Sequence, residues 1–310
     1  MKKVIIAVAA ASLAMGFASV ASAASDVKGV ISNKAEVKKS ANVAIGEGAK
    51  ARMGTVALKN SSVKGVVTNN AKVDKSANVA IGKDSKANMG SISMDRSKIK
   101  GVVSNKADIG KSANVAIGGG TANMGTIDMK GSSVKGVVTN NAKVDKSANV
   151  AIGEGASSNM ASVAMDHSNV KGVISNKADI GKSANVAIGK GASANMGAID
   201  MKGSNVKGVV TNRANVDKSA NVAIGEGATS NMASISMDRA NVKGVISNKA
   251  DIAKSANVAI GNDATANMGT VAIKNAKIQG VVTNQASVDK SANVAIGNGS
   301  EASMGSVTIE

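Results

Sequence analysis

The sequence contains no cysteine, no proline, no tryptophan and no tyrosine, and its single phenylalanine is Phe17. Without cysteine, the chain has no disulfide framework. Aromatic side chains supply much of the buried area of an ordinary globular core, so a core of this chain has to be built from Val, Ile, Ala and Met. These absences point to backbone pairing and repetition as the main sources of stability.

The first residues have the pattern of a secretory signal peptide. Two lysines precede an uncharged apolar run from Val4 to Val20, and Ala21-Ser22-Ala23 is a small-x-small cleavage site. We predict that residues 1–23 are removed and that the protein is exported to the cell surface or the extracellular space. The apolar run is too short to favour a permanent anchor, so no transmembrane segment is predicted in the mature chain, residues 24–310.

The balance of charge is basic. The whole chain carries +17, and loss of the two leader lysines leaves +15, from 36 basic and 21 acidic residues. A basic exported chain attracts polyanions such as acidic polysaccharide, lipid phosphate or extracellular DNA, although charge also keeps an exposed surface soluble. Because the mature chain has no Arg-rich cluster and no base-stacking aromatic, sequence-specific nucleic-acid recognition is not predicted.

An internal repeat dominates the mature sequence. The octapeptide Lys-Ser-Ala-Asn-Val-Ala-Ile-Gly occurs eight times, at spacings of 36 residues with a single spacing of 35. The short repeat lacks a residue near Gly118–Thr121, where a turn can absorb a deletion. The octapeptides begin at Lys39, Lys75, Lys111, Lys146, Lys182, Lys218, Lys254 and Lys290.

Each repeat consists of short β-branched segments between turn residues. Val206–Thr211, Val222–Ile224 and Met232–Met237 are examples, and such segments are typical of strands rather than helices. Strands this short must stack in register on their equivalents in the next coil. The sequence therefore predicts an all-β fold, a parallel β-solenoid of eight 36-residue repeats that forms one domain over residues 24–310.

Two coil lengths are compatible with this repeat. Hexads that begin at Val67, Val73 and Val79 would close a triangular coil of half a repeat, with each coil rising ~4.8 Å along the axis. One coil per repeat would bring the charges of successive repeats together, but its wide interior would be difficult to fill without aromatics. We therefore expect about two coils per repeat.

Several columns are the same in all eight repeats, and we assign them structural roles. Stacked asparagine amides can form hydrogen-bonded ladders, and glycine allows sharp corners. One asparagine column is Asn33, Asn69, Asn105, Asn140, Asn176, Asn212, Asn248 and Asn284. The predicted stacking ladder is Asn42, Asn78, Asn114, Asn149, Asn185, Asn221, Asn257 and Asn293. The predicted corner glycines include Gly29, Gly65, Gly101 and Gly136, and Gly46, Gly82, Gly118 and Gly153.

Two further columns alternate in charge, which favours stacking of successive repeats. Duplication of a 72-residue unit of two repeat types would also produce the alternation. The first column is Lys59, Asp95, Lys130, Asp166, Lys202, Asp238, Lys274 and Glu310, and the second begins Glu36, Lys72, Asp108, Lys143 and Asp179.

Residues for catalysis are scarce. His167 is the only histidine, so neither a His-based triad nor a multi-His metal site can be assembled. Gly118–Gly120 lacks the Gly-Lys-Ser/Thr of a phosphate loop, and the methionine column that includes Met89, Met124 and Met196 is assigned to the core. We predict no enzyme activity, no cofactor and no metal.

The octapeptide lysines, Lys39 to Lys290, are the best candidates for a binding surface. At two coils per repeat they would lie ~10 Å apart, which is about a Debye length, so their mutual repulsion would be mild. Such a stripe could bind an acidic polymer. A solvated face that prevents lateral aggregation is the alternative.

The segment Ser40-Ala-Asn-Val-Ala-Ile-Gly-Glu-Gly-Ala-Lys-Ala51 resembles the head repeats of hemagglutinin-type trimeric autotransporter adhesins. That resemblance implies a left-handed β-roll on a surface adhesin. The general plan, a leader followed by repeats, is similar to that of curli-type secreted fibre subunits.

The repeats carry no evident polar caps, so unpaired strand edges are expected to template another chain. We predict a self-assembling subunit of a surface or matrix fibre whose partner is a further copy of itself, joined head to tail. A monomeric adhesin that binds acidic glycans is the alternative. An ice-binding solenoid that uses the column Thr55, Ser91, Thr126 and Ser162 is a further, weaker alternative.

Overall fold

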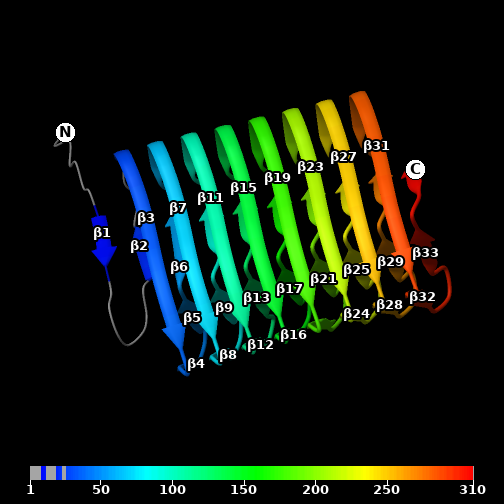
Figure 1. Cartoon of the computed structure of the whole chain (residues 1–310), viewed down its shortest axis with the longest axis horizontal. Coiled ribbons are helices and arrows are strands. Elements are labelled where there is room, and N and C mark those ends of the chain that lie inside the picture. Colours follow the sequence, from blue (N-terminus) through cyan, green and yellow to red (C-terminus); the bar gives the residue numbers. More distant parts are fainter. Residues whose placement is uncertain (1–7, 12–18, 23–25, 310) are drawn as a thin grey trace.

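The computed structural model describes residues 8–11, 19–22 and 26–309, and every regular element in these ranges is a β-strand. The chain forms a parallel β-solenoid of eight coils, which confirms the predicted fold class (Figure 1). The predicted signal peptide lies partly outside the described residues. Its described pieces are β1 (Val8–Ala11), which pairs with the first coil in one sheet, and β2 (Ser19–Ser22), which pairs with it in another.

Each coil contributes one strand to each of four parallel sheets, in the chain order A, C, D, B. Sheet A contains β3 (Asp26–Lys38), β7 (Ser62–Asp74), β11 (Lys98–Gly110), β15 (Ser133–Asp145), β19 (Asn169–Gly181), β23 (Asn205–Asp217), β27 (Asn241–Ala253) and β31 (Lys277–Asp289). Sheet C contains β4 (Ala41–Ile45), β8 (Ala77–Ile81), β12 (Ala113–Ile117), β16 (Ala148–Ile152), β20 (Ala184–Ile188), β24 (Ala220–Ile224), β28 (Ala256–Ile260) and β32 (Ala292–Ile296). Sheet D contains β5 (Lys50–Met53), β9 (Lys86–Met89), β13 (Thr121–Met124), β17 (Ser157–Met160), β21 (Ser193–Met196), β25 (Thr229–Met232), β29 (Thr265–Met268) and β33 (Glu301–Met304). Sheet B contains β6 (Thr55–Lys59), β10 (Ile92–Asp95), β14 (Ile127–Lys130), β18 (Val163–Asp166), β22 (Ile199–Lys202), β26 (Ile235–Asp238), β30 (Val271–Lys274) and β34 (Val307–Ile309).

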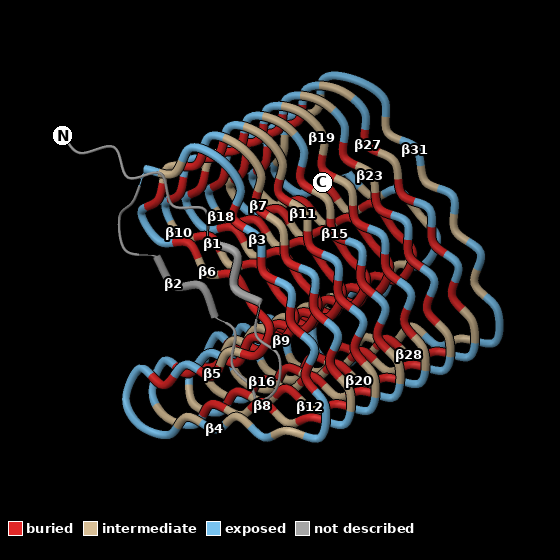
Figure 2. The backbone as a smooth tube through the Cα atoms, turned by 60° about the vertical axis from the view of Figure 1, so that its left-hand side comes forward, coloured by how far each residue is buried: buried red, intermediate tan, exposed pale blue. Residues whose placement is uncertain are grey.

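The register shows one coil per repeat, so the expectation of about two coils per repeat was wrong. Asn105 lies between Asn69 and Asn140, its equivalents in the preceding and following repeats. The interior of a 36-residue coil is not wide, because the coil is flattened into two layers that lie against each other (Figure 2). Val67 packs in one core cluster with Met94 of the opposite layer, and further along the coil the apolar side chains that meet are mainly alanines.

The alternating charges confirm this stacking. Asp95 is in register with Lys59 and Lys130, and Lys72 is in register with Glu36 and Asp108. Opposite charges therefore face each other between neighbouring strands, as the sequence predicted. Glu310, the last member of the first column, lies outside the described residues.

The 35-residue spacing is absorbed in a turn, as predicted. Ile117, at the end of β12, is in register with Ile81 and Ile152, and Thr121, at the start of β13, is in register with Lys86 and Ser157. The missing residue therefore belongs to the Gly118–Gly120 turn between these strands, and neither neighbouring coil is displaced.

Ladders of asparagine hydrogen bonds join the coils. In the column from Asn33 to Asn284, each Nδ2 donates to the Oδ1 of the next coil at 2.8–2.9 Å. The column from Asn42 to Asn293 forms a second ladder at 2.8–3.0 Å. A third ladder, which sequence reasoning missed, runs in the opposite direction from Asn267 to Asn123. Because buried amides need partners, these ladders hold the coils in register.

One glycine column requires the absence of a side chain. Gly136 has φ 140°, and a Cβ atom there would collide with the carbonyl oxygen of Gly101 in the preceding coil. Gly155, in a surface turn, has φ 65°, and a Cβ atom there would meet nothing within 4 Å.

We predict that Gly136→Ala lowers the free energy of unfolding by at least about 3 kcal/mol, because the collision adds to backbone strain of roughly 1–3 kcal/mol. Gly155→Ala is the matched control, with an expected loss of about 1–2 kcal/mol from the left-handed conformation alone. Urea unfolding followed by circular dichroism measures both. Equal losses would contradict the close approach of the two backbones.

Candidate functional site: a lysine-lined groove

A two-residue corner, Lys-Ser, joins sheet A to sheet C in every coil. The eight corner lysines have a left-handed backbone conformation, with φ between 47° and 51°. The serine that follows turns inward: Ser112 Oγ donates to the carbonyl oxygen of Gly110 at 2.8 Å and accepts the backbone N–H of Ser76 at 3.3 Å. The serine hydroxyl thus closes the corner, while the lysine side chain is exposed.

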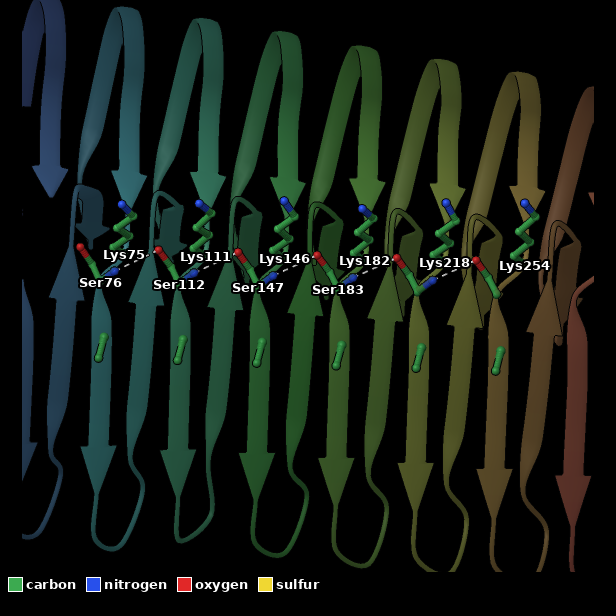
Figure 3. A pocket seen from close by; sticks show the side chains of 18 of the residues that line it. Lys75, Ser76, Lys111, Ser112, Lys146, Ser147, Lys182, Ser183, Lys218 and Lys254 are labelled. Atoms are coloured by element: carbon green, nitrogen blue, oxygen red, sulfur yellow. Dashed lines mark hydrogen bonds between the residues drawn. The ribbon is translucent and has the colours of Figure 1, made fainter. Parts of the chain in front are cut away.

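These corners line an open pocket of ≈ 1410 Å³ that follows the solenoid past all eight coils (Figure 3). The Lys, Ser and Ala of each coil line it, and its C-terminal end reaches Val288 and Met304. We call this pocket the lysine groove. The predicted stripe of lysines therefore lies along one continuous feature: Lys39, Lys75, Lys111, Lys146, Lys182, Lys218, Lys254 and Lys290.

The spacing of these lysines differs from the prediction, because one coil per repeat brings them closer. Neighbouring coils lie ~4.8 Å apart, not ~10 Å, and the eight lysines span about 34 Å. Two unit charges ~4.8 Å apart repel by about 0.9 kcal/mol in water. The mild repulsion expected from the sequence is therefore an underestimate.

The corner lysines also adopt an unfavourable backbone conformation. A left-handed conformation costs a residue with a side chain roughly 1–2 kcal/mol, and glycine avoids most of this. The corners between sheets D and B and between sheets B and A are also left-handed, and their residues vary. Between sheets D and B they are Gly54, Gly90, Gly125, Ala161, Gly197, Ala233, Gly269 and Gly305, and between sheets B and A they are Asn60, Arg96, Gly131, His167, Gly203, Arg239 and Asn275. The A–C corner alone has lysine in every coil.

Acidic residues near the groove are fewer than its lysines. The residue before each corner lysine is an aspartate in four of the eight coils: Asp74, Asp145, Asp217 and Asp289. Lys218 Nζ lies 3.9 Å from Asp217 Oδ2. In the other coils Lys38, Gly110, Gly181 and Ala253 occupy this position, so the groove retains an excess of positive charge.

Almost the entire net charge of the mature chain lies on sheet A and its corner. The eight sheet A strands and the corner lysines contain 25 basic and 9 acidic residues, whereas the rest of the mature chain contains 11 basic and 12 acidic residues. A second exposed lysine column, which sequence reasoning did not single out, contributes to this face. It consists of Lys28, Lys64, Lys100, Lys135, Lys171, Lys207 and Lys243, with Gln279 in the last coil.

The neighbouring sheet C has an uncharged outer face. Every strand of this sheet has the sequence Ala-Asn-Val-Ala-Ile, in which the asparagine and the second alanine point inward. The first alanine, the valine and the isoleucine therefore face outward; Ile152, for example, is 36% exposed. An apolar surface thus adjoins the lysine groove along the whole solenoid.

The remaining candidate residues lie elsewhere. His167 is exposed on the B–A corner, and the methionines Met89, Met124 and Met196 are buried in the core, as predicted. The column Thr55, Ser91, Thr126 and Ser162 is buried, with exposures of 0–1%, and so it cannot present a flat face to ice. That column follows a left-handed corner and turns inward, as the serines of the A–C corner do.

Within the described ranges, no group of three or more His, Cys, Asp or Glu side chains is placed to hold a metal ion. Over the same ranges, no helix is long and apolar enough to cross a membrane. Two aspartates stand out: burial raises the pKa of the Asp128 and Asp200 carboxyl groups, although Asn123 and Asn195 each donate a 3.3 Å hydrogen bond that opposes the rise.

We predict that Asp128→Asn and Asp200→Asn stabilise the fold at pH 7. A raised carboxyl pKa means that the native state binds the proton more tightly than the unfolded state, so stability falls as the pH rises above the unfolded pKa of about 3.9. The gain from each substitution should disappear below that pH. Thermal unfolding between pH 3 and 8 tests this, with Asp95→Asn on an exposed column as the control for net charge. A gain in stability that does not depend on pH would contradict a raised pKa of these carboxyl groups.

Comparisons of the chain with protein-family models, with curated protein sequences and with solved structures found no match. The resemblance to adhesin head repeats therefore stays a prediction. What the chain does has to be inferred from its own residues.

Proposed function

We propose that the mature chain is a structural subunit of an extracellular fibre in which the last coil of one subunit stacks on the first coil of the next. The main support is that these two coils are complementary in the same way as neighbouring coils within the chain. Hydrogen bonds, charges and apolar edges each contribute.

The buried asparagine ladder has an open end. Among the described residues, no donor reaches the buried Oδ1 of Asn33 in the first coil. At the other end, Asn284 Nδ2 donates to the carbonyl oxygens of Gly269 and Ser306. Within the stack, Asn69 makes the equivalent bond to Gly54 at 3.0 Å and also donates to Asn105 Oδ1. If subunits stacked end to end, Asn284 could donate to Asn33 Oδ1 of the next subunit in that way.

The charges of the two coils also match. In continued register, Lys277 of the last coil would face Asp26 of the next subunit, and Asp289 would face Lys38. Gln279, the one member of its column that is not lysine, would face Lys28. Each opposite-charge pair contributes roughly 0.2–1 kcal/mol across strands, and the glutamine avoids one like-charge contact.

Apolar side chains are more exposed on the last coil than within the stack. Val281 is 57% exposed, whereas Val137 at the same position in an inner coil is 36% exposed, and Ile296 and Ile152 differ in the same way, at 53% and 36%. β31 is the last strand of sheet A. A further coil would cover these side chains and pair the strand edge.

The first coil is covered by the segment that is predicted to be removed. β1 pairs with β3 and β2 pairs with β6, and both β1 and β2 lie within residues 1–23. Cleavage after Ala23 would therefore open the edges of β3 and β6 to another subunit. On this proposal, only the processed chain assembles.

We predict that purified residues 24–310 form fibres visible by electron microscopy, with a 4.7–4.8 Å cross-β reflection. Val282→Lys should prevent their growth, because it places a charge on the inward side of β31 that a stacked coil would bury. Val281→Lys, on the outward side of the same strand, is the matched control and should still form fibres.

Circular dichroism of both variants checks that the solenoid itself remains folded. Dispersed monomers of the unsubstituted mature chain would overturn the proposal. Fibre growth by folded Val282→Lys at the unsubstituted rate would show that the subunits do not join through β31.

A further inference from the structure

The corner lysines are the feature of the coil that folding alone does not explain. Inward serine hydroxyls close the A–C corner, and glycine or asparagine would suit its left-handed backbone better. The two other left-handed corners do use these residues in many coils. Lysine nevertheless occupies all eight A–C corners, where like charges lie side by side. What lysine adds at this position is an exposed ammonium group in the groove.

We infer that the lysine groove binds a linear polyuronate, an acidic polysaccharide with one carboxylate on each sugar. The groove offers one ammonium group per coil, at a rise of ~4.8 Å. The length of one sugar in an extended uronate chain is close to this rise. Neighbouring sugars turn their carboxylates to different sides, so the carboxylates that face the groove recur at a whole multiple of the lysine spacing, and each of them can meet a lysine. A bound polyanion would also remove the repulsion between the lysines, which favours the bound state.

The surroundings of the groove favour a polysaccharide over other polyanions. The alanine of each Lys-Ser-Ala corner lines the groove, and the outward valines and isoleucines of sheet C adjoin it. Sugar rings carry C–H groups on their faces that can pack on such side chains, whereas phosphate chains have no apolar face. The mature chain has no aromatic residue on which nucleic-acid bases could stack.

Charge outside the groove would guide the polymer to it. Sheet A, which ends at the lysine corner, and the corner lysines together carry a balance of 25 basic to 9 acidic residues. A face of one sign raises the local concentration of an oppositely charged ligand. The groove is complete within a single chain, so this inference holds for a monomer as well as for a fibre.

The test compares two fourfold variants of equal net charge. The groove variant carries Lys111→Asn, Lys146→Asn, Lys182→Asn and Lys218→Asn, and the face variant carries Lys100→Asn, Lys135→Asn, Lys171→Asn and Lys207→Asn. Calorimetric titration with polygalacturonate should show binding by the unsubstituted chain that weakens at least about ten-fold in the groove variant, as the loss of four exposed ion pairs would produce. The face variant should lose less than about three-fold, because it affects only steering.

The melting temperature of the groove variant shows whether weaker binding results from loss of the lysines or from loss of the fold. Asparagine tolerates the left-handed conformation better than lysine, so the groove variant should melt at the same temperature as the unsubstituted chain or higher. A lower melting temperature would contradict the view that lysine is unfavourable at this corner. Equal weakening of binding in the two variants would overturn the groove as the site, since net charge alone would then explain the affinity.

Ligand identity is tested with defined probes. Affinity should increase with the length of oligogalacturonates to at least about eight sugars, the length of the groove in one subunit at about 34 Å, and fully methyl-esterified chains should not bind. Double-stranded DNA, single-stranded DNA and vesicles of anionic phospholipid are the competing probes. Tighter binding of any of these than of polygalacturonate, with the same dependence on the groove lysines, would overturn the assignment to a polyuronate.

Discussion

The structure depends on the in-register pairing of each coil with the next. Because equivalent residues lie ~4.8 Å apart, every side chain has to tolerate its own equivalent as a neighbour. Asparagine does so by donating to the next amide, as Asn69 does to Asn105. Alanine and methionine do so by packing in columns, and Gly136 does so by having no side chain at all.

The same constraint explains how much of the fold could be predicted. Column identity alone indicates a parallel solenoid, its register and the turn at Gly118–Gly120. The repeat period alone does not give the coil length, because 18-residue and 36-residue coils both return equivalent residues of successive repeats to one column, although the shorter coil places a different residue between them. Val67 and Val73, which begin two of the hexads, lie on one continuous strand, β7, so no corner separates them. What decides the coil length is packing between opposite layers, whose residues, such as Val67 and Met94, share one core cluster, and this packing has no signature in the repeat.

The candidate site could be predicted only in part, because its geometry also depends on the coil length. The lysine column is evident in the sequence, but its left-handed backbone, its groove and its close spacing follow from the coil geometry. A recurrent signal was available: a left-handed residue followed by an inward serine or threonine occurs at all three corners, as in Lys111-Ser112, Gly125-Thr126 and Arg96-Ser97. Recognition of that motif would have placed the Thr55 column inside the coil and excluded the ice-binding face. The direction of the third asparagine ladder, by contrast, depends on rotamers that the sequence does not specify.

The coil edges and the lysine groove are different surfaces, and the stacking of coils connects them. End-to-end assembly uses the coil edges, whereas the lysine groove runs along the side. If subunits stack as proposed, Lys290 of one lies a single coil from Lys39 of the next, and the groove continues across the junction without a change in spacing. Each further subunit then adds eight lysines to the same line, so a long polyanion would bind many weak sites at high effective concentration. On this view the unfavourable lysine corner is retained because the advantage of many weak contacts increases with the length of the fibre, whereas the conformational cost per coil does not.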